Sequence, residues 1–351
     1  MIPGEGQIPV FFPPHDPGRR VVPLALACGI GTVRLEDGPT PEAGRFQRVV
    51  AEGAKYFRAV TTPAEAAICC HPHAIGGGLP PQQALQLGRI AQAAGKPALF
   101  FDFGDDDTPS DLPYGLVYRT SLRRSLIRPR ERAMPAACRP VRPGGQLPAI
   151  REKGQRPRIG FCGYVAGPGK RLLMRLRGQG QNVLGHQVRS AALSALRRAE
   201  KQGMVETDLV VHRHFGGGFL RFRQDKARVE QTRQAFERNL AAADYTLCAR
   251  GAGNFSVRFY ETLSAGRVPL LIDTDCVLPF EEEIDWRAHL VWVDAADVRR
   301  CGQVLAEFHA RLSPTALQGL QEANRRLWES WLEPLTALRH ICRSARNAPM
   351  Q

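Results

Sequence analysis

The sequence lacks the features that mark several classes of protein. No window approaches about eighteen uncharged apolar residues, so no membrane-spanning helix is expected. Residues 1–14 lack the basic start and long apolar stretch of a signal peptide. Aromatic residues make up 7% of the chain and are not interleaved with the basic ones, which disfavours nucleic acid as a partner. Nine cysteines in 351 residues do not form a recognisable disulfide framework, so a cytoplasmic location is the simplest prediction.

Acidic residues and lysine are scarce as well. The 34 Asp and Glu face 48 Lys and Arg, of which six are Lys, and the net charge is +14. A GC-rich genome that favours arginine codons explains most of this surplus. Peripheral association with the inner membrane face stays open, because each exposed basic residue near an anionic leaflet contributes about 1 kcal/mol. The basic run at 119–132 fits either a solvated face or a grip on an anionic acceptor or membrane.

Short apolar runs alternate with helical stretches along the chain, which predicts parallel, doubly wound sheets. Residues 134–157 contain five prolines and three glycines and form the best domain boundary. We therefore predict two domains, at 1–150 and 151–351. The strands expected in the first domain lie at 21–28, 66–70, 97–103 and 116–119, with helices at 46–59 and 81–94. In the second domain we expect helices at 188–202, 225–242, 296–311 and 314–343.

The most informative segment is 244–286. It predicts a strand at 245–248, a glycine-broken turn at 250–254, a helix at 257–265 and a second strand at 268–272. Such a succession directs the N–H groups of the turn and of the helix N-terminus to one point. That point suits a phosphate or a pyrophosphate.

The same segment carries a resemblance. ARGAGNFSVRFYETLSAGRVPLLI, followed by LPFEEEIDW, resembles the signature of exostosin-like glycosyltransferases, with a weaker similarity at RIGFCG (158–163). The resemblance implies transfer of a sugar from a nucleotide-sugar donor to the hydroxyl of a glycan or lipid-linked acceptor. It also implies the GT-B architecture, in which two Rossmann-like domains face a cleft and C-terminal helices follow. In that fold the donor lies on the C-terminal domain and the acceptor faces the N-terminal one.

Several residues become candidates for the donor site. Arg250 and Arg258 would neutralise the leaving pyrophosphate, and the resemblance implies that Glu261 accepts hydrogen bonds from the ribose. Ser256 would cap the helix or offer its hydroxyl. The full candidate set is Arg250, Gly251, Gly253, Asn254, Ser256, Arg258, Glu261, Gly163 and Arg158. The alternative is an ordinary glycine turn with an ion pair between Arg258 and Glu261, three positions apart on a helix.

FCGYVAGPGKR (161–171) is a glycine-rich turn after a strand. Gly163 would lie nearest the donor phosphates, with Arg158 or Lys170 supplying charge. The spacing is not that of a P-loop, and Arg171 stands where a Ser or Thr would bind magnesium. An ordinary turn between a strand and a helix is the alternative.

An inverting transfer also needs a base for the acceptor proton. The candidates are Asp106, Asp102 and His73, at the ends of strands of the first domain. A carboxylate between aromatic residues, as in FFDFGDDD (100–107), would have a raised pKa; the alternative is a solvated acidic loop. Asp105–Asp107 and Asp273–Asp275 fit the Asp-x-Asp pattern of metal-dependent transferases, but Arg250 and Arg258 already supply positive charge. We therefore expect no metal and no other cofactor.

The leading hypothesis is thus a metal-independent, inverting glycosyltransferase of the exostosin-like type. A catalytically silent protein that binds a nucleotide or an anionic glycan in the same place is the alternative. A nucleic-acid binder driven by net charge is a weaker third option.

Overall fold

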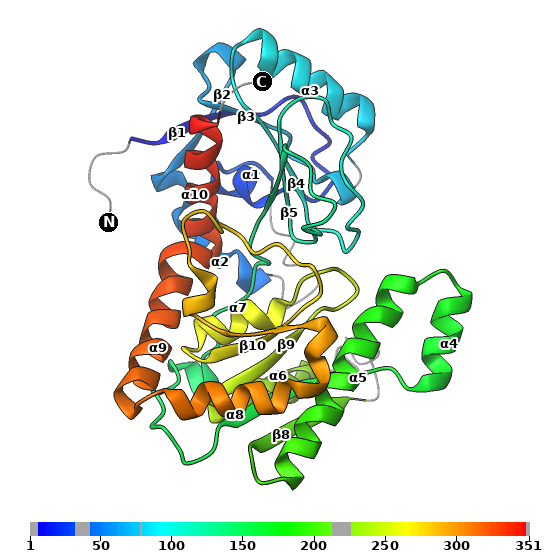
Figure 1. Cartoon of the computed structure of the whole chain (residues 1–351). Helices are drawn as coiled ribbons and strands as arrows, with labels where there is room; N and C mark the ends of the chain where they lie inside the picture. Colours follow the sequence, from blue (N-terminus) through cyan, green and yellow to red (C-terminus); the bar gives the residue numbers. More distant parts are fainter. Residues whose placement is uncertain (1–5, 32–42, 78, 213–225, 349–351) are drawn as a thin grey trace. The chain divides into compact units, whose positions relative to one another are not determined.

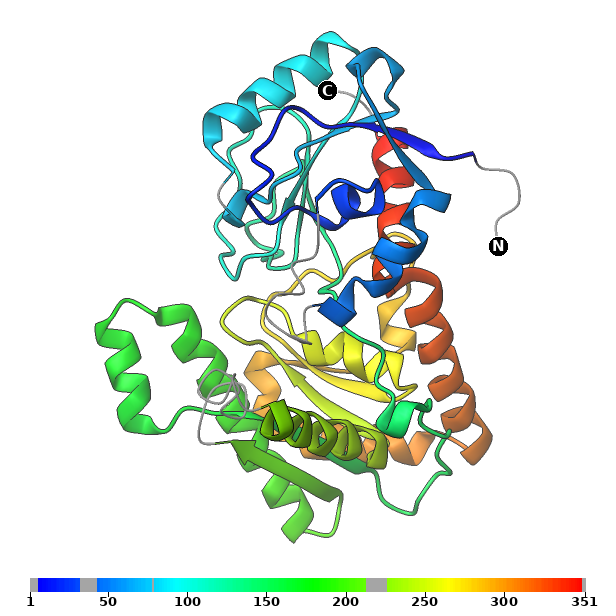
Figure 2. The same cartoon turned by 180° about the vertical axis from the view of Figure 1, so that it is seen from behind.

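The computed structural model describes residues 6–31, 43–77, 79–212 and 226–348. They form two compact units, which Figure 1 and Figure 2 show from opposite sides. Unit 1 comprises Met1–Arg139, Val277–Phe280 and Ser330–Gln351, and unit 2 comprises Pro140–Cys276 and Glu281–Glu329. Each unit contains one parallel sheet with helices, which confirms the predicted α/β class with two Rossmann-like sheets and C-terminal helices. A cleft between two domains stays a prediction.

Unit 1 is built on a six-stranded parallel sheet in the order β2-β1-β3-β4-β5-β6. Its strands are β1 (Ile8–Phe11), β2 (Phe57–Val60), β3 (Ile68–Cys70), β4 (Ala98–Asp102), β5 (Leu116–Arg119) and β6 (Glu131–Ala133). Successive side chains of a strand point to opposite faces. Leu99 and Phe101 of β4 therefore enter one apolar cluster, while Ala98 and Phe100 enter another.

Helices cover both faces of this sheet. The cluster around Phe100 includes residues of α3 (Pro81–Ala93), whereas the cluster around Phe101 includes residues of α1 (Pro23–Ala27) and α10 (Pro334–Asn347). The short α2 (Gln47–Glu52) contacts α1 and α10. The last helix of the chain thus packs in unit 1, whereas the sequence predicts it in the second domain.

Two predictions for unit 1 are wrong. The run at 21–28 forms α1 rather than a strand, with Pro23 at its first position, where the missing N–H is not needed. The helix expected at 46–59 ends at Glu52, and its last residues form β2, which pairs with β1. A short apolar run can form either a strand or a buried helix, and contacts with distant parts of the chain determine which of the two it forms.

Unit 2 contains a five-stranded parallel sheet in the order β11-β10-β9-β7-β8. Its strands are β7 (Arg158–Tyr164), β8 (Glu206–His212), β9 (Tyr245–Ala249), β10 (Val268–Asp273) and β11 (Val291–Asp294). Its helices are α4 (Pro168–Leu176), α5 (Gly180–Lys201), α6 (Lys226–Ala242), α7 (Val257–Ser264), α8 (Cys301–Arg311) and α9 (Pro314–Leu327). α8 lies in front of the sheet in Figure 1, and α6 lies in front of it in Figure 2, so the sheet is covered on both faces.

The segment 244–286 folds as predicted up to β10. Every residue of β9 is buried, α7 spans Val257–Ser264, and Gly266 follows with a φ of 64°. Glycine reaches that left-handed conformation without strain. Elsewhere helices are longer or divided: α5 begins at Gly180 rather than at 188, α4 was missed, and Pro334 begins a separate helix after α9.

Asp244 fixes the amino ends of the central strands of unit 2. Its buried carboxylate accepts hydrogen bonds from the backbone N–H of Arg158 at 3.1 Å and from Nε of Arg151 at 2.5 Å. Its own N–H donates to the carbonyl of Arg158. One side chain therefore joins the starts of β7 and β9 to the segment that precedes β7.

We expect Asp244→Ala to destabilise the protein by about 2–4 kcal/mol, because a buried N–H and a half-buried guanidinium lose their acceptor. Urea unfolding followed by circular dichroism measures this. Asp111→Ala is the matched control, because that carboxylate is 86% exposed in its pair with Arg128 and contributes within about 0.5 kcal/mol. Equal stability of the two variants would contradict the role of Asp244.

Candidate functional site

Parallel pairing brings the ends of two strands of unit 2 to one edge. β7 pairs with β9 at Ile159 and Gly160, so their last residues, Tyr164 and Ala249, lie at the same carboxyl edge of the sheet. The strand order reverses between β7 and β9. In doubly wound sheets, ligands bind at the carboxyl ends of the strands at such a reversal.

The turn after β9 leads into α7 at this edge. The N–H of Gly251 donates to the carbonyl of Phe255 at 3.2 Å. Ser256 is the N-cap residue of α7 and has an extended backbone, but its hydroxyl accepts no hydrogen bond from the first turn. The first N–H groups of a helix carry the positive end of its dipole and suit an anion.

Asn254 holds this turn against the turn after β10. Its buried side-chain amide donates to the carbonyl of Asp275 at 3.1 Å and accepts from the hydroxyl of Thr274 at 2.7 Å. Asp273, in turn, accepts from the N–H of Cys276. The candidate Asn254 therefore positions the turn after β9 against the turn after β10. The Asp-x-Asp segment 273–275 forms part of that second turn.

Arg250 is buried directly after β9. Its Nη2 donates to Oε1 of Gln181 and to the carbonyl of Ala252, both at 2.9 Å. These contacts fix the guanidinium between the start of α5 and the glycine turn.

Arg258 is the second residue of α7 and is half-buried. Its guanidinium carbon lies 4.7 Å from the ring centre of Phe236 and 5.4 Å from that of Phe161. A Cβ on Gly163 would lie 3.2 Å from Nη1 of Arg258, so a glycine at 163 leaves room beside this cation. The Nε atom of Arg258 is buried and has no hydrogen-bond partner among the described residues.

Arg189 of α5 is a third cation at this edge, and the sequence did not point to it. Its Nη1 donates to the carbonyl of Tyr164 at 3.2 Å and its Nη2 to that of Ala249 at 3.5 Å, so it bridges the ends of β7 and β9. Burial lowers the pKa of Arg189 to about 10, and the positive charge of Arg258 is the second, smaller cause. The group remains charged at neutral pH, although its Nε is buried without a partner in the described part of the chain.

These cations make the carboxyl edge electropositive. Within the described residues, neither Arg189 nor Arg258 forms an ion pair with a carboxylate. A buried guanidinium that lacks a counter-charge is costly, and an anion that accepts hydrogen bonds removes that cost. We call Arg189, Arg250 and Arg258, with the turn 251–256 and the start of α7, the arginine edge.

Glu261 lies on α7 one turn after Arg258, and both act on the same thiol. Burial raises the pKa of Cys162, Arg258 lowers it, and Asp208 and Glu261 raise it further. Glu261 is therefore near enough to Cys162 of β7 to influence its thiol, as Arg258 is.

Arg158 is not brought to this edge. It is the first residue of β7, whereas Gly163 and Tyr164 are at the end of that strand. At about 3.3 Å per residue the two ends are roughly 20 Å apart. The backbone of Arg158 is bound to Asp244 instead, so its predicted donor contact lacks support from this geometry.

Two of the candidate bases in unit 1 are engaged in structural contacts. Asp102 accepts from the N–H of Gly104 at 2.9 Å and lies 3.3 Å from Nε of the buried Arg119. Asp106 accepts from both the N–H and the hydroxyl of Thr108, and the backbone hydrogen bond from Thr108 lowers its pKa. The expected raised pKa is therefore wrong for Asp106, because donors rather than aromatic rings surround its carboxylate.

His73 has the geometry of a neutral base. Its Nδ1 lies 2.9 Å from the carbonyl oxygen of Arg20, and a carbonyl only accepts, so Nδ1 carries the proton. In the neutral ring the lone pair is then on Nε2, which is buried and lacks a partner among the residues described. His71 accepts from the N–H of His73 at 3.1 Å, and burial, followed by the charge of His73, lowers the pKa of His71 to about 4.

Comparisons with known proteins show a similarity over the segment that contains the turn. The model of the Exostosin GT47 domain matches residues 191–308, which include β8 to β11 and α7. This match confirms the resemblance predicted from the sequence. Arg250, Arg258 and Glu261 lie inside the matched segment, whereas Arg189 and His73 lie outside it.

Curated relatives agree with this family. Exostosin-1 of Drosophila melanogaster is 30% identical over 109 residues, which are 31% of this chain and 14% of that protein. The Exostosin-1 homolog of Caenorhabditis elegans is 30% identical over 115 residues, 32% of this chain and 29% of that protein. The chain thus spans less than a third of either relative.

Two solved structures are similar at low scores. A glycosyltransferase from Rickettsia africae ESF-5 has a TM-score of 0.43 and 10% identity, with 99% of this chain and all of that chain covered. Glycosyltransferase VinC in complex with dTDP has a TM-score of 0.34 and 12% identity, over 97% and 99% of the two chains. These scores are too low to argue a shared fold.

Gly185 allows α5 to approach the arginine edge. A Cβ at this position would lie 2.1 Å from the carbonyl oxygen of Gly251, so Gly185→Ala must displace the turn. We expect a loss of about 1–3 kcal/mol of stability and at least roughly tenfold weaker binding of inorganic pyrophosphate, measured by isothermal titration calorimetry.

Gly319→Ala is the matched control, because nothing lies within 4 Å of its added methyl on α9. It should bind pyrophosphate as the parent does and gain up to about 1 kcal/mol from helix propensity. Unchanged pyrophosphate binding in Gly185→Ala would separate the turn from the anion site.

Proposed function

We propose that this chain, which matches the model of the Exostosin GT47 domain over residues 191–308, is a glycosyltransferase that moves a sugar from a nucleotide-sugar donor to an acceptor hydroxyl. The observation that carries the proposal is the arginine edge. Arg189 and Arg258 lie close together beside the N-terminus of α7, and the Nε of each is buried with no hydrogen-bond partner among the residues that the structure describes. A nucleoside diphosphate supplies the charge and the acceptor oxygens that this edge lacks.

The arginine edge suits the chemistry of the leaving group. When the acceptor oxygen forms its bond to the anomeric carbon, the bond from that carbon to the diphosphate breaks and its electron pair leaves with the diphosphate. The developing charge is stabilised by Arg189, Arg250 and Arg258, which are already fixed by protein contacts before the reaction. Cations of the protein thus supply the charge for which other transferases use a metal, and we propose a metal-independent reaction.

The remaining candidates have supporting roles. Gly163 and Gly251 leave space beside the guanidinium groups, since a Cβ on Gly251 would lie 3.4 Å from Nη2 of Arg189. Gly253, in the same turn, permits close approach of the backbone. Ser256 and Glu261 flank Arg258 on α7, and we assign Glu261 to the ribose hydroxyls of the donor.

We assign the acceptor proton to Nε2 of His73. Among the three candidates in unit 1, His73 alone combines a defined lone pair with burial and with no protein donor directed at it among the described residues. Asp102 is held by Arg119, and the lowered pKa of Asp106 makes it a weak base. Proton removal by a base of the protein fits an inverting transfer to a glycan or lipid-linked acceptor.

A thermal-shift panel of nucleotide-sugars tests donor binding. A nucleotide-sugar that specifically stabilises the protein is then used to measure donor affinity and turnover of the variants. We expect Arg258→Met to weaken donor affinity at least roughly tenfold and to lower turnover by about two orders of magnitude. The free energy of unfolding of this variant without ligand should stay the same or rise by up to about 1 kcal/mol, because the substitution removes a cation that has no counter-charge.

Arg197→Met is the matched control, because Arg197 is exposed on the same α5 helix that holds Arg189. It should leave donor binding and turnover unchanged. Normal donor binding by Arg258→Met, or the absence of any stabilising nucleotide-sugar, would reject the proposed site. Donor binding without sugar transfer or donor hydrolysis would instead identify a catalytically silent binding protein.

His73→Asn tests the base. We expect transfer to fall by about two to four orders of magnitude with the donor-induced thermal shift unchanged.

His71→Asn is its control, because an asparagine oxygen can replace the Nδ1 that accepts from the N–H of His73. It should retain transfer. If Asp106→Asn abolishes transfer while His73→Asn does not, the carboxylate is the base and our assignment is wrong.

A further inference from the structure

α4 is a helix without a buried face. None of its nine residues, Pro168–Leu176, is buried. It lies alongside the first half of α5 and projects from unit 2 in both Figure 1 and Figure 2. A helix that contributes so little to a core needs another reason for its apolar residues.

Three leucines form one exposed stripe on α4. Leu172, Leu173 and Leu176 are 60%, 46% and 77% exposed. At about 100° per residue they fall within a third of the helix circumference, because positions three and four apart share a face. Such a group of large apolar side chains indicates a surface that binds something apolar.

Basic residues flank the leucine stripe on both sides. Helical spacing places Arg171 and Arg175 at one border of the stripe and Lys170 and Arg177 at the other. The sequence contains no Asp or Glu between Glu152 and Glu200, so neither α4 nor most of α5 carries a compensating acid. Within the described residues, none of these four cations is paired with a carboxylate.

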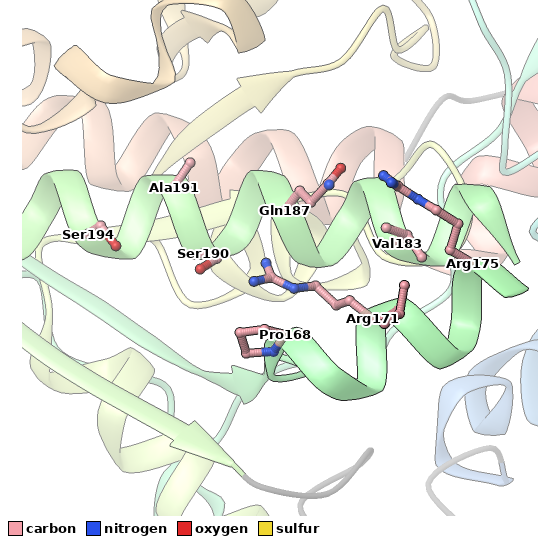
Figure 3. A pocket seen from close by; sticks show the side chains of 9 residues that line it. Pro168, Arg171, Arg175, Val183, Gln187, Ser190, Ala191 and Ser194 are labelled. Atoms are coloured by element: carbon pink, nitrogen blue, oxygen red, sulfur yellow. The ribbon is translucent and has the colours of Figure 1, made fainter.

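A groove of about 450 Å³ separates α4 from α5. Figure 3 shows Arg171 and Arg175 extending along it, with Gln187, Ser190 and Ser194 on the α5 side. Two guanidinium groups opposite uncharged donors suit a phosphate. The apolar stripe and these two guanidinium groups thus lie next to each other on one helix.

We propose that α4 docks on a bilayer that contains anionic phospholipid. The leucine stripe enters the boundary between head groups and acyl chains, and Lys170, Arg171, Arg175 and Arg177 contact lipid phosphates. Basic residues on both borders of an aliphatic stripe complement this surface in charge and in polarity. Among the described residues, no helix has the length and hydropathy of a membrane span. This inference does not rest on the transfer reaction.

The basic run at 119–132 does not compete with α4 for this role. Arg119 is buried against Asp102 and Glu131, Arg123 pairs with Asp107, and Arg128 pairs with Asp111. Three of the six arginines in this run thus have a carboxylate partner. An anionic surface would have to displace these carboxylates.

Flotation of the full chain with vesicles of equimolar phosphatidylglycerol and phosphatidylcholine tests the proposal, with pure phosphatidylcholine vesicles as the neutral comparison. The parent should float with the anionic vesicles and only weakly with the neutral ones. Leu172→Ser/Leu176→Ser should lose roughly tenfold or more in affinity for the anionic vesicles. Arg175→Glu/Arg177→Glu should lose at least about tenfold on anionic vesicles and little on neutral ones.

α3 provides matched controls, because Leu85 and Arg89 are exposed on that helix. Leu85→Ser and Arg89→Glu should float as the parent does. All variants should keep the parent's unfolding temperature and its donor-induced thermal shift, so that loss of vesicle binding is distinguished from loss of the donor site. No flotation of the parent, equal flotation of the α4 variants, or binding of nucleic acid in preference to vesicles would overturn the proposal.

Discussion

The proposed donor site depends on positive charge that no carboxylate of the described residues pairs with. Arg189 bridges the carbonyls of Tyr164 and Ala249, and Arg258 stacks on two phenylalanine rings, so both are held without a carboxylate in the described structure. The lowered pKa of Arg189 expresses the cost of this arrangement, which burial causes and Arg258 increases. Buried charges that lack a counter-charge are typical of functional sites, where a bound anion offsets their desolvation penalty.

Arg119 of unit 1 shows how differently the same side chain is used when a structure needs it. It is buried between Asp102 and Glu131 and donates to the carbonyls of Thr108 and Asp106, so its charge is matched within the protein. The arginine edge of unit 2 has backbone carbonyls, aromatic rings and a helix N-terminus instead. We therefore interpret Arg119 as structural and Arg189 with Arg258 as ligand-binding.

Local sequence patterns predicted the elements that glycines bound at both ends. They did not predict the features that depend on contacts between residues far apart in the sequence. Gly251, Gly253 and Gly266 delimit the turn and α7, so the segment 244–286 was predictable in order and nearly in bounds. Arg189 was not, because it lies in the middle of a helix, twenty-five residues after β7, and no short motif joins it to Tyr164. The tautomer of His73 likewise depends on a carbonyl fifty-three residues away in the sequence. The periodicity of apolar residues indicates only how residues a few positions apart are arranged.

The crystal structure of the chain with inorganic pyrophosphate is the most direct test of the arginine edge. The probe needs no knowledge of the base or the sugar. We expect its oxygens about 3 Å from the guanidinium nitrogens of Arg189 and Arg258 and beside the first N–H groups of α7. Pyrophosphate bound elsewhere, or Arg189 and Arg258 closed in ion pairs with carboxylates of the protein, would contradict the account.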